Sequence, residues 1–70
     1  MADQEIEIVY HVFTHGMDDW LSDYHEAKAL YETFAREYGS ARLYEERYID
    51  RANDIMESEN CLLSFGPFPW

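Results

Sequence analysis

The side chains most capable of chemistry in this chain are its three histidines, which we first test as metal ligands. A zinc site needs three or four ligands about 2.0–2.3 Å from the ion. His11 and His15 lie four residues apart on a segment with the pattern of a strand, which separates them by roughly 13 Å. His25 falls in a segment with a helical pattern. The spacing predicts ordinary surface or boundary histidines and no metal site.

The cysteine and the carboxylates give no catalytic pattern either. Cys61 precedes two leucines in an apolar stretch, where we expect a buried and inert thiol. The sequence has no Asp-x-Asp-x-Asp-Gly calcium loop and no phosphate-binding glycine loop. Paired catalytic carboxylates also need a cleft, and the single helix over three strands that we expect below offers little concavity. We therefore expect no catalytic residue, no cofactor and no enzymatic activity, and a protein that acts by binding.

Length and composition predict one domain over residues 1–70, with a thin core rich in aromatic side chains. A chain of this size buries only about 60% of the surface that its unfolded form exposes. Aromatic residues make up 17% of the sequence and bury a large area each, which favours folding. With one cysteine, no apolar run long enough to span a bilayer and no signal-peptide pattern at the start, we expect a cytoplasmic protein without a membrane role.

Two segments have clear periodicity. Residues 5–14 are expected to form a strand, because apolar side chains alternate along it and Gly16 then breaks the run. Residues 19–38 are expected to form an amphipathic helix, with Asp18 or Asp19 as its cap and Gly39 ending it. Its apolar stripe comprises Trp20, Tyr24, Ala27, Tyr31, Phe34 and Tyr38, flanked by Leu30.

The second half of the chain is more ambiguous. Residues 42–50 favour a strand by their tyrosine content, although apolar residues through position 55 also fall at helical steps, so residues 42–57 could be strand or helix. Residues 51–54 resemble a hairpin loop, and residues 55–65 would return as an antiparallel strand, irregular around residues 58–60. The expected fold class is α+β, in the order β-α-β-β. A three-stranded sheet would carry one long amphipathic helix on one face and leave the other partly open.

Fifteen acidic residues against five basic ones give a formal charge of −10, which suits a partner with a basic surface and opposes direct binding of nucleic acid. Asp19, Asp23 and Glu26 are expected on one helical face, about 5–6 Å apart, as an imitation of a phosphate backbone. A second acidic group is expected across the hairpin, formed by Glu45, Glu46, Asp50, Asp54, Glu57 and Glu59. Solvated faces and edge protection are the alternative interpretation of both groups.

The C-terminal residues Phe65, Phe68 and Trp70 form an aromatic cluster. They could fold back onto the open face of the sheet and enlarge the core. Alternatively, Phe68 and Trp70 could form an exposed contact for a partner or for a second copy of the chain. The sequence is compatible with a monomer or a homodimer.

In size, charge and layout the chain resembles the small acidic inhibitors that bacteriophages direct against host defence systems, including anti-CRISPR proteins and anti-restriction DNA mimics. The resemblance rests on Asp19, Asp23 and Glu26 and on residues 43–48, within an acidic chain of 70 residues. It implies a stoichiometric inhibitor in the host cytosol that occupies a basic nucleic-acid-binding site of a defence complex. No functional residue is transferred by a shared motif, so the residues named come from charge geometry.

Two other functions stay open from the sequence. The protein could be a small structural or adaptor subunit that docks through its aromatic C-terminal tail, with the acidic surface providing solubility. It could also be an antitoxin-like neutraliser of a basic protein, which would share the electrostatic mechanism and differ in the partner.

Overall fold

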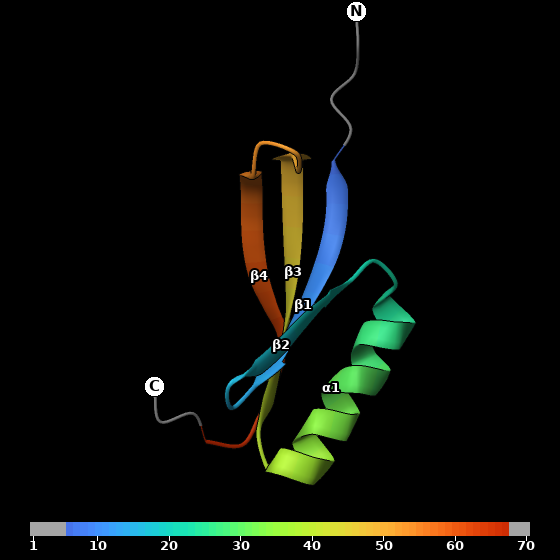
Figure 1. Cartoon of the computed structure of the whole chain (residues 1–70), viewed down its shortest axis with the longest axis vertical. Helices are drawn as coiled ribbons and strands as arrows, with labels where there is room; N and C mark the ends of the chain where they lie inside the picture. The colour runs from blue at the N-terminus through green and yellow to red at the C-terminus, as the bar shows by residue number, and fades with distance from the viewer. Residues whose placement is uncertain (1–5, 68–70) are drawn as a thin grey trace, which may run out of the picture.

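The computed structural model describes residues 6–67, which form an α+β arrangement of one helix and an antiparallel sheet (Figure 1). Within these residues the order is β1 (Glu7–Thr14), β2 (Met17–Leu21), α1 (Tyr24–Tyr38), β3 (Ala41–Asp50) and β4 (Ile55–Phe65). The strands lie in the order β2-β1-β3-β4, and every neighbouring pair is antiparallel. The fold class was predicted correctly as α+β, but the sheet has four strands, so the predicted three-stranded β-α-β-β order is wrong.

The additional strand is β2, which occupies the region predicted as the start of the helix. Gly16 takes a positive φ of 71°, which lets a two-residue connection reverse the chain between Thr14 and Met17. Trp20 then lies opposite His11 in the β1–β2 ladder and stacks on its ring. Trp20 is therefore part of a strand and not of the helical stripe, because pairing with β1 outweighs its four-residue spacing from Tyr24.

Both ends of α1 have capping residues. The Asp23 side chain accepts a hydrogen bond from the Glu26 backbone N–H at 2.9 Å, so Asp23 is the N-cap in place of Asp18 or Asp19. At the other end Gly39 has a φ of 79°, and its N–H donates to the Ala35 carbonyl oxygen. The predicted C-terminal glycine is thus confirmed, whereas the predicted start of the helix is four to five residues too early.

The core lies between α1 and the faces of β1 and β3 that it covers. Val12, Ala27 and Leu43 are fully buried at its centre. The helical stripe packs around them through Tyr24, Leu30, Tyr31 and Phe34, as its periodicity predicted. Tyr38 is 46% exposed and does not belong to this cluster. The core is thin because a single helix covers only part of the sheet (Figure 1).

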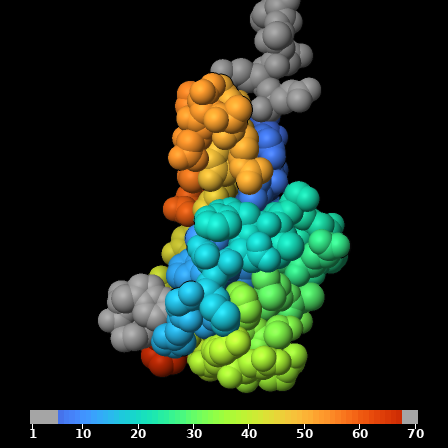
Figure 2. Space-filling model, viewed as in Figure 1, coloured from blue at the N-terminus to red at the C-terminus, as the bar shows by residue number. Residues whose placement is uncertain are grey.

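Residues 42–57, which the sequence left open between strand and helix, form most of β3, a turn and the start of β4. β3 and β4 form a hairpin joined by a turn over residues 51–54, as predicted. The ladder shifts register on both sides of residues 58–60, which leaves Leu62 and Glu57 without a directly opposite partner. Residues 58–60, predicted to be irregular, are themselves regularly paired, and Glu59 lies opposite Glu46. The end of the hairpin that contains the turn projects beyond the body formed by β2 and α1 (Figure 2).

A tight contact closes the opposite end of the molecule. The Thr14 hydroxyl donates a 2.6 Å hydrogen bond to the Ser40 carbonyl oxygen, and both residues are buried. Gly66 lies against the backbone of Gly39 and Ser40. Phe68 and Trp70, predicted as an aromatic contact, lie outside the described residues. Between residues 6 and 67 there is no helix with the length and apolar character needed to cross a membrane.

Candidate functional site

Strand alternation and register gather ionisable side chains on the face of the sheet opposite α1, which we call the helix-free face. Directly opposite residues in an antiparallel ladder point to the same side, and positions two apart along a strand share a side. The registers Phe13↔Asp18, Val9↔Glu46 and Glu46↔Glu59 therefore place these carboxylates on the same side as His11. We call His11, Asp18, Glu46 and Glu59 the His11 cluster.

The His11 ring is held on several sides. Its Nε2 lies 3.0 Å from Asp18 Oδ2, and its Nδ1 lies 3.4 Å from Glu46 Oε2. The Trp20 ring stacks on it with centroids 4.3 Å apart and planes at 5°. The strand pairing therefore fixes both the position of the imidazole and the direction in which each ring nitrogen points.

Glu46 is the most unusual member of the cluster, because it is an acidic residue that is only 3% exposed. A buried carboxylate is costly unless hydrogen bonds satisfy it. The Tyr48 hydroxyl donates to Glu46 Oε1 at 2.8 Å, and this hydrogen bond, followed by burial and the negative charge of Glu46, raises the pKa of Tyr48 to about 12. Glu46 is thus held in place by a neighbour on its own strand.

Glu59 completes the cluster from the edge strand β4. Partial desolvation, and then the neighbouring Glu46 carboxyl, raise the pKa of the Glu59 carboxyl above its ordinary value, while His11 opposes this shift. Donor atoms of His11, Glu46 and Glu59 all lie within 4.8 Å of one another. Among residues 6–67, no lysine or arginine forms an ion pair with Asp18, Glu46 or Glu59. The arrangement is suited to holding a cation.

Sequence reasoning missed the His11 cluster because it compared the histidines with one another. The cluster joins His11 to carboxylates on β3 and β4, which are distant in the sequence and become neighbours only through the β1–β3 and β3–β4 registers. The register shifts in the β3–β4 ladder decide which β4 side chains share a face with Glu46. No local spacing in the sequence carries this information.

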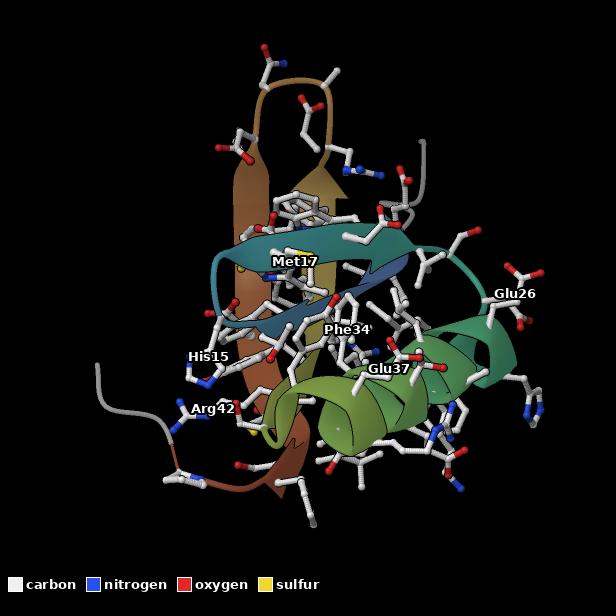
Figure 3. All side chains as sticks on the ribbon, turned by 60° about the horizontal axis from the view of Figure 1, so that its bottom comes forward. His15, Met17, Glu26, Phe34, Glu37 and Arg42 are labelled. Carbon is white, nitrogen blue, oxygen red and sulfur yellow. The ribbon has the colours of Figure 1, made fainter. Side chains whose placement is uncertain are left out.

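The first predicted acidic row is not a helical row. Asp19 lies on β2, Asp23 caps α1 and Glu26 lies in its first turn. All three are exposed, and the structure shows no ion pair from any of them to another residue in the 6–67 range. They follow the chain from β2 into α1, so the predicted helical spacing is wrong, but each of the three residues is exposed, and Figure 3 labels Glu26 near the start of the helix.

The second predicted acidic group is divided by the sheet. Glu45 and Glu57 lie 3.6 and 3.7 Å from the Arg47 guanidinium, whose single positive charge offsets part of their negative charge.

The other members of that group lie elsewhere. Asp50 accepts hydrogen bonds from the backbone and side chain of Asn53, which lower the pKa of Asp50, and Asp54 lies in the turn with a φ of 60°. Glu46 and Glu59 belong to the His11 cluster, and Glu46 is buried. The expectation of one acidic group across the hairpin is therefore wrong, because its members are divided among Arg47, the turn and the His11 cluster.

A hollow of about 320 Å³ borders the cluster at the β1–β2 turn, lined by His11, Phe13, Thr14, Gly16, Met17 and Asp18. It is open to solvent and lacks a nucleophile paired with a base. Comparison with protein-family models, with curated proteins and with solved structures finds no match to this chain.

Proposed function

We propose that this protein is a stoichiometric, non-enzymatic inhibitor that places exposed carboxylates in the basic nucleic-acid-binding site of a partner protein, such as a nuclease or surveillance complex of a host defence system. The observation that carries the proposal is the set of exposed carboxylates Asp19, Asp23 and Glu26, which have no basic partner among the residues that the structure describes. Such carboxylates are available to an external cation without first breaking an internal ion pair.

The exposed residues of β2, of α1 and of the segment between them form a surface that we call the β2–α1 surface. Its charge balance supports this choice. Along α1, Glu26, Glu32 and Glu37 are exposed against two exposed basic residues, Lys28 and Arg36. Asp19 and Asp23 extend the excess of negative charge toward β2. Complementary charge accelerates association and gives specificity, although each solvent-exposed ion pair contributes only about 0.2–1 kcal/mol. Binding should therefore depend on several carboxylates acting together and should weaken as salt concentration rises.

The test compares two triple variants that remove the same charge. Asp19→Asn, Asp23→Asn and Glu26→Gln together remove three negative charges from the β2–α1 surface, and asparagine at position 23 preserves the helix cap. Glu45→Gln, Asp54→Asn and Glu57→Gln remove three charges from the hairpin. Low-salt capture from a host lysate should recover a nucleic-acid-binding protein that DNA competes away. The first variant should weaken this binding about tenfold, or roughly 1.4 kcal/mol.

The hairpin variant has the same net charge as the β2–α1 variant, but it should bind nearly as well as the parent protein. Equal weakening by the two variants would mean that net charge alone acts, without a defined surface. Capture that is insensitive to competing DNA and to high salt would exclude the proposed mode of binding.

An adaptor function is the second candidate, because the edge strand β4 exposes large apolar side chains. Ile55, Met56, Leu62 and Phe65 are each 39–52% exposed along this strand. Edge strands with exposed apolar residues are typical sites of strand pairing with another chain. A Leu62→Ser, Phe65→Ser variant that remains folded but loses its partner, while the β2–α1 carboxylate variant keeps it, would favour the adaptor. Removal of residues 67–70 tests the contribution of the tail separately.

A further inference from the structure

We propose that the His11 cluster is a binding site for one divalent transition-metal ion of the zinc class, with His11 Nδ1, Glu46 and Glu59 as ligands. This proposal does not depend on the inhibitor function, because it concerns the helix-free face and not the β2–α1 surface. Its basis is the convergence of an imidazole nitrogen and two carboxylates from three neighbouring strands, with donor atoms that lie within 4.8 Å of one another.

The geometry of the first two ligands already fits a small ion. In a tetrahedral zinc site, ligand atoms about 2.0–2.2 Å from the metal are about 3.3 Å from each other. His11 Nδ1 and Glu46 Oε2 are 3.4 Å apart, which matches one edge of such a tetrahedron. Glu59 lies on an edge strand and is exposed, so its side chain can move toward the ion by a rotamer change. Water would fill the remaining position.

The surroundings of these ligands are those that metal sites commonly have. A metal-bound histidine usually donates its second ring N–H to a carboxylate, which fixes the tautomer and leaves the other nitrogen for the metal. Asp18 Oδ2 lies 3.0 Å from His11 Nε2 and is placed to accept that hydrogen bond. Tyr48 donates to Glu46 Oε1 and thereby leaves Oε2 directed at the site. Trp20 stacks on the imidazole and prevents it from rotating away.

The charge of the cluster also favours a cation. Asp18, Glu46 and Glu59 supply three carboxylates around one imidazole, and no lysine or arginine within residues 6–67 pairs with them. Glu46 is almost completely buried, where an uncompensated negative charge is most costly. Oε2 of Glu46 and Nδ1 of His11 attract each other only when a proton or a metal ion lies between them. The alternative to a metal ion is therefore a proton between these two atoms, and the experiment must distinguish the two.

The donor set selects the class of metal. One imidazole nitrogen with two carboxylates suits Zn²⁺, Co²⁺ or Mn²⁺, whereas Ca²⁺ and Mg²⁺ prefer oxygen ligands alone. Zn²⁺ is the appropriate probe for affinity. Co²⁺ is the appropriate probe for position, because it can quench the fluorescence of an indole beside the site.

The test is a calorimetric titration of tag-free, chelator-treated protein with Zn²⁺, and separately with Mg²⁺. We expect equimolar Zn²⁺ binding, a raised melting temperature and binding of Mg²⁺ at least a hundredfold weaker. In a Trp70→Phe background, where Trp20 is the remaining tryptophan, Co²⁺ should quench the fluorescence and excess Zn²⁺ should restore it. Asp18→Asn should weaken Zn²⁺ binding about tenfold, as for other residues that orient a ligand.

The ligand variants are His11→Gln and Glu59→Gln, and the matched controls are His25→Ala and Glu45→Gln. Glu59 and His25 are both exposed, so circular dichroism should show folded proteins and their binding can be compared directly. Each ligand variant should reduce the affinity at least a hundredfold and each control should leave it unchanged. Zn²⁺ binding that persists in both ligand variants would overturn the proposal. So would the absence of equimolar Zn²⁺ binding by the parent protein.

Discussion

The Trp20 indole stacks on the His11 imidazole with ring centroids 4.3 Å apart and planes at 5°. The two residues face each other across the β1–β2 ladder, so this contact ties the edge strand β2 to the centre of the sheet. It also accounts for the difference between the predicted and observed start of the helix, because Trp20 gains more from the sheet than from a place on α1.

Replacing Trp20 tests the role of this stack. Trp20→Ala should lower the free energy of unfolding by about 1–3 kcal/mol, because it removes the stacking and part of the buried area. Trp20→Phe keeps an aromatic face over His11 and should recover about half of that loss. Urea denaturation of the three proteins measures the difference. Equal stability of the alanine and parent proteins would show that β2 is held by its backbone pairing alone.

The buried hydrogen bond between Thr14 and Ser40 connects the end of β1 to the start of β3. Thr14→Val keeps the shape but leaves the Ser40 carbonyl oxygen without this donor, so it should destabilise the protein by about 1–3 kcal/mol. Ser40→Ala is the matched control. The Ser40 hydroxyl is buried and has no hydrogen-bond partner among residues 6–67, so its removal should leave the free energy of unfolding unchanged or raise it. Thermal or urea unfolding that ranks the two variants in the reverse order would contradict this account.

Gly66 and Gly16 both have positive φ angles but have different surroundings. A Cβ at Gly66 would overlap the Gly39 carbonyl oxygen, whereas a Cβ at Gly16 would meet no other atom within 4 Å. Gly16→Ala should therefore cost only the backbone strain, about 1–2 kcal/mol. Gly66→Ala adds a clash with backbone and should cost roughly 2–5 kcal/mol in total. Urea denaturation midpoints, compared at a common m-value, would establish which variant loses more stability. Similar losses for both variants would show that the backbone near Gly66 shifts at little cost to make room for the Cβ.

The Tyr48 hydroxyl is predicted to make stability depend on alkaline pH. Its pKa is about 12 in the folded protein, raised by the hydrogen bond to Glu46, against about 10 in an unfolded chain. Below pH 10 the phenol is protonated in both states, so its contribution to stability is complete. Between about pH 10 and pH 12 it ionises only in the unfolded chain, and the free energy of unfolding falls.

The measurement compares the parent protein with Tyr48→Phe across that pH range. The difference in stability between them should shrink as the pH rises from 10 to 12, since phenylalanine does not titrate. Phenolate absorbance should also show one tyrosine with a raised pKa that is absent from Tyr48→Phe and returns toward 10 in Glu46→Gln. A parallel pH dependence of the two proteins would count against the Tyr48–Glu46 hydrogen bond.

The sequence by itself determined the features that depend on local spacing. The 3.6-residue period from Tyr24 to Phe34 specifies a helix with one apolar side, and Gly39 supplies the left-handed residue that ends it. Alternation specifies β1, and the tyrosine-rich segment with its polar loop specifies the β3–β4 hairpin. The acidic charge follows from composition alone.

The tertiary structure decided which of two local periodicities Trp20 follows and which side chains become neighbours across the sheet. The first depends on a stacking contact with His11, and the second on register shifts that bring Glu59 opposite Glu46. A shift of one residue in a ladder would turn these carboxylates to the other face. The His11 cluster therefore exists only because of pairing between distant strands, which the identities and spacing of nearby residues do not encode.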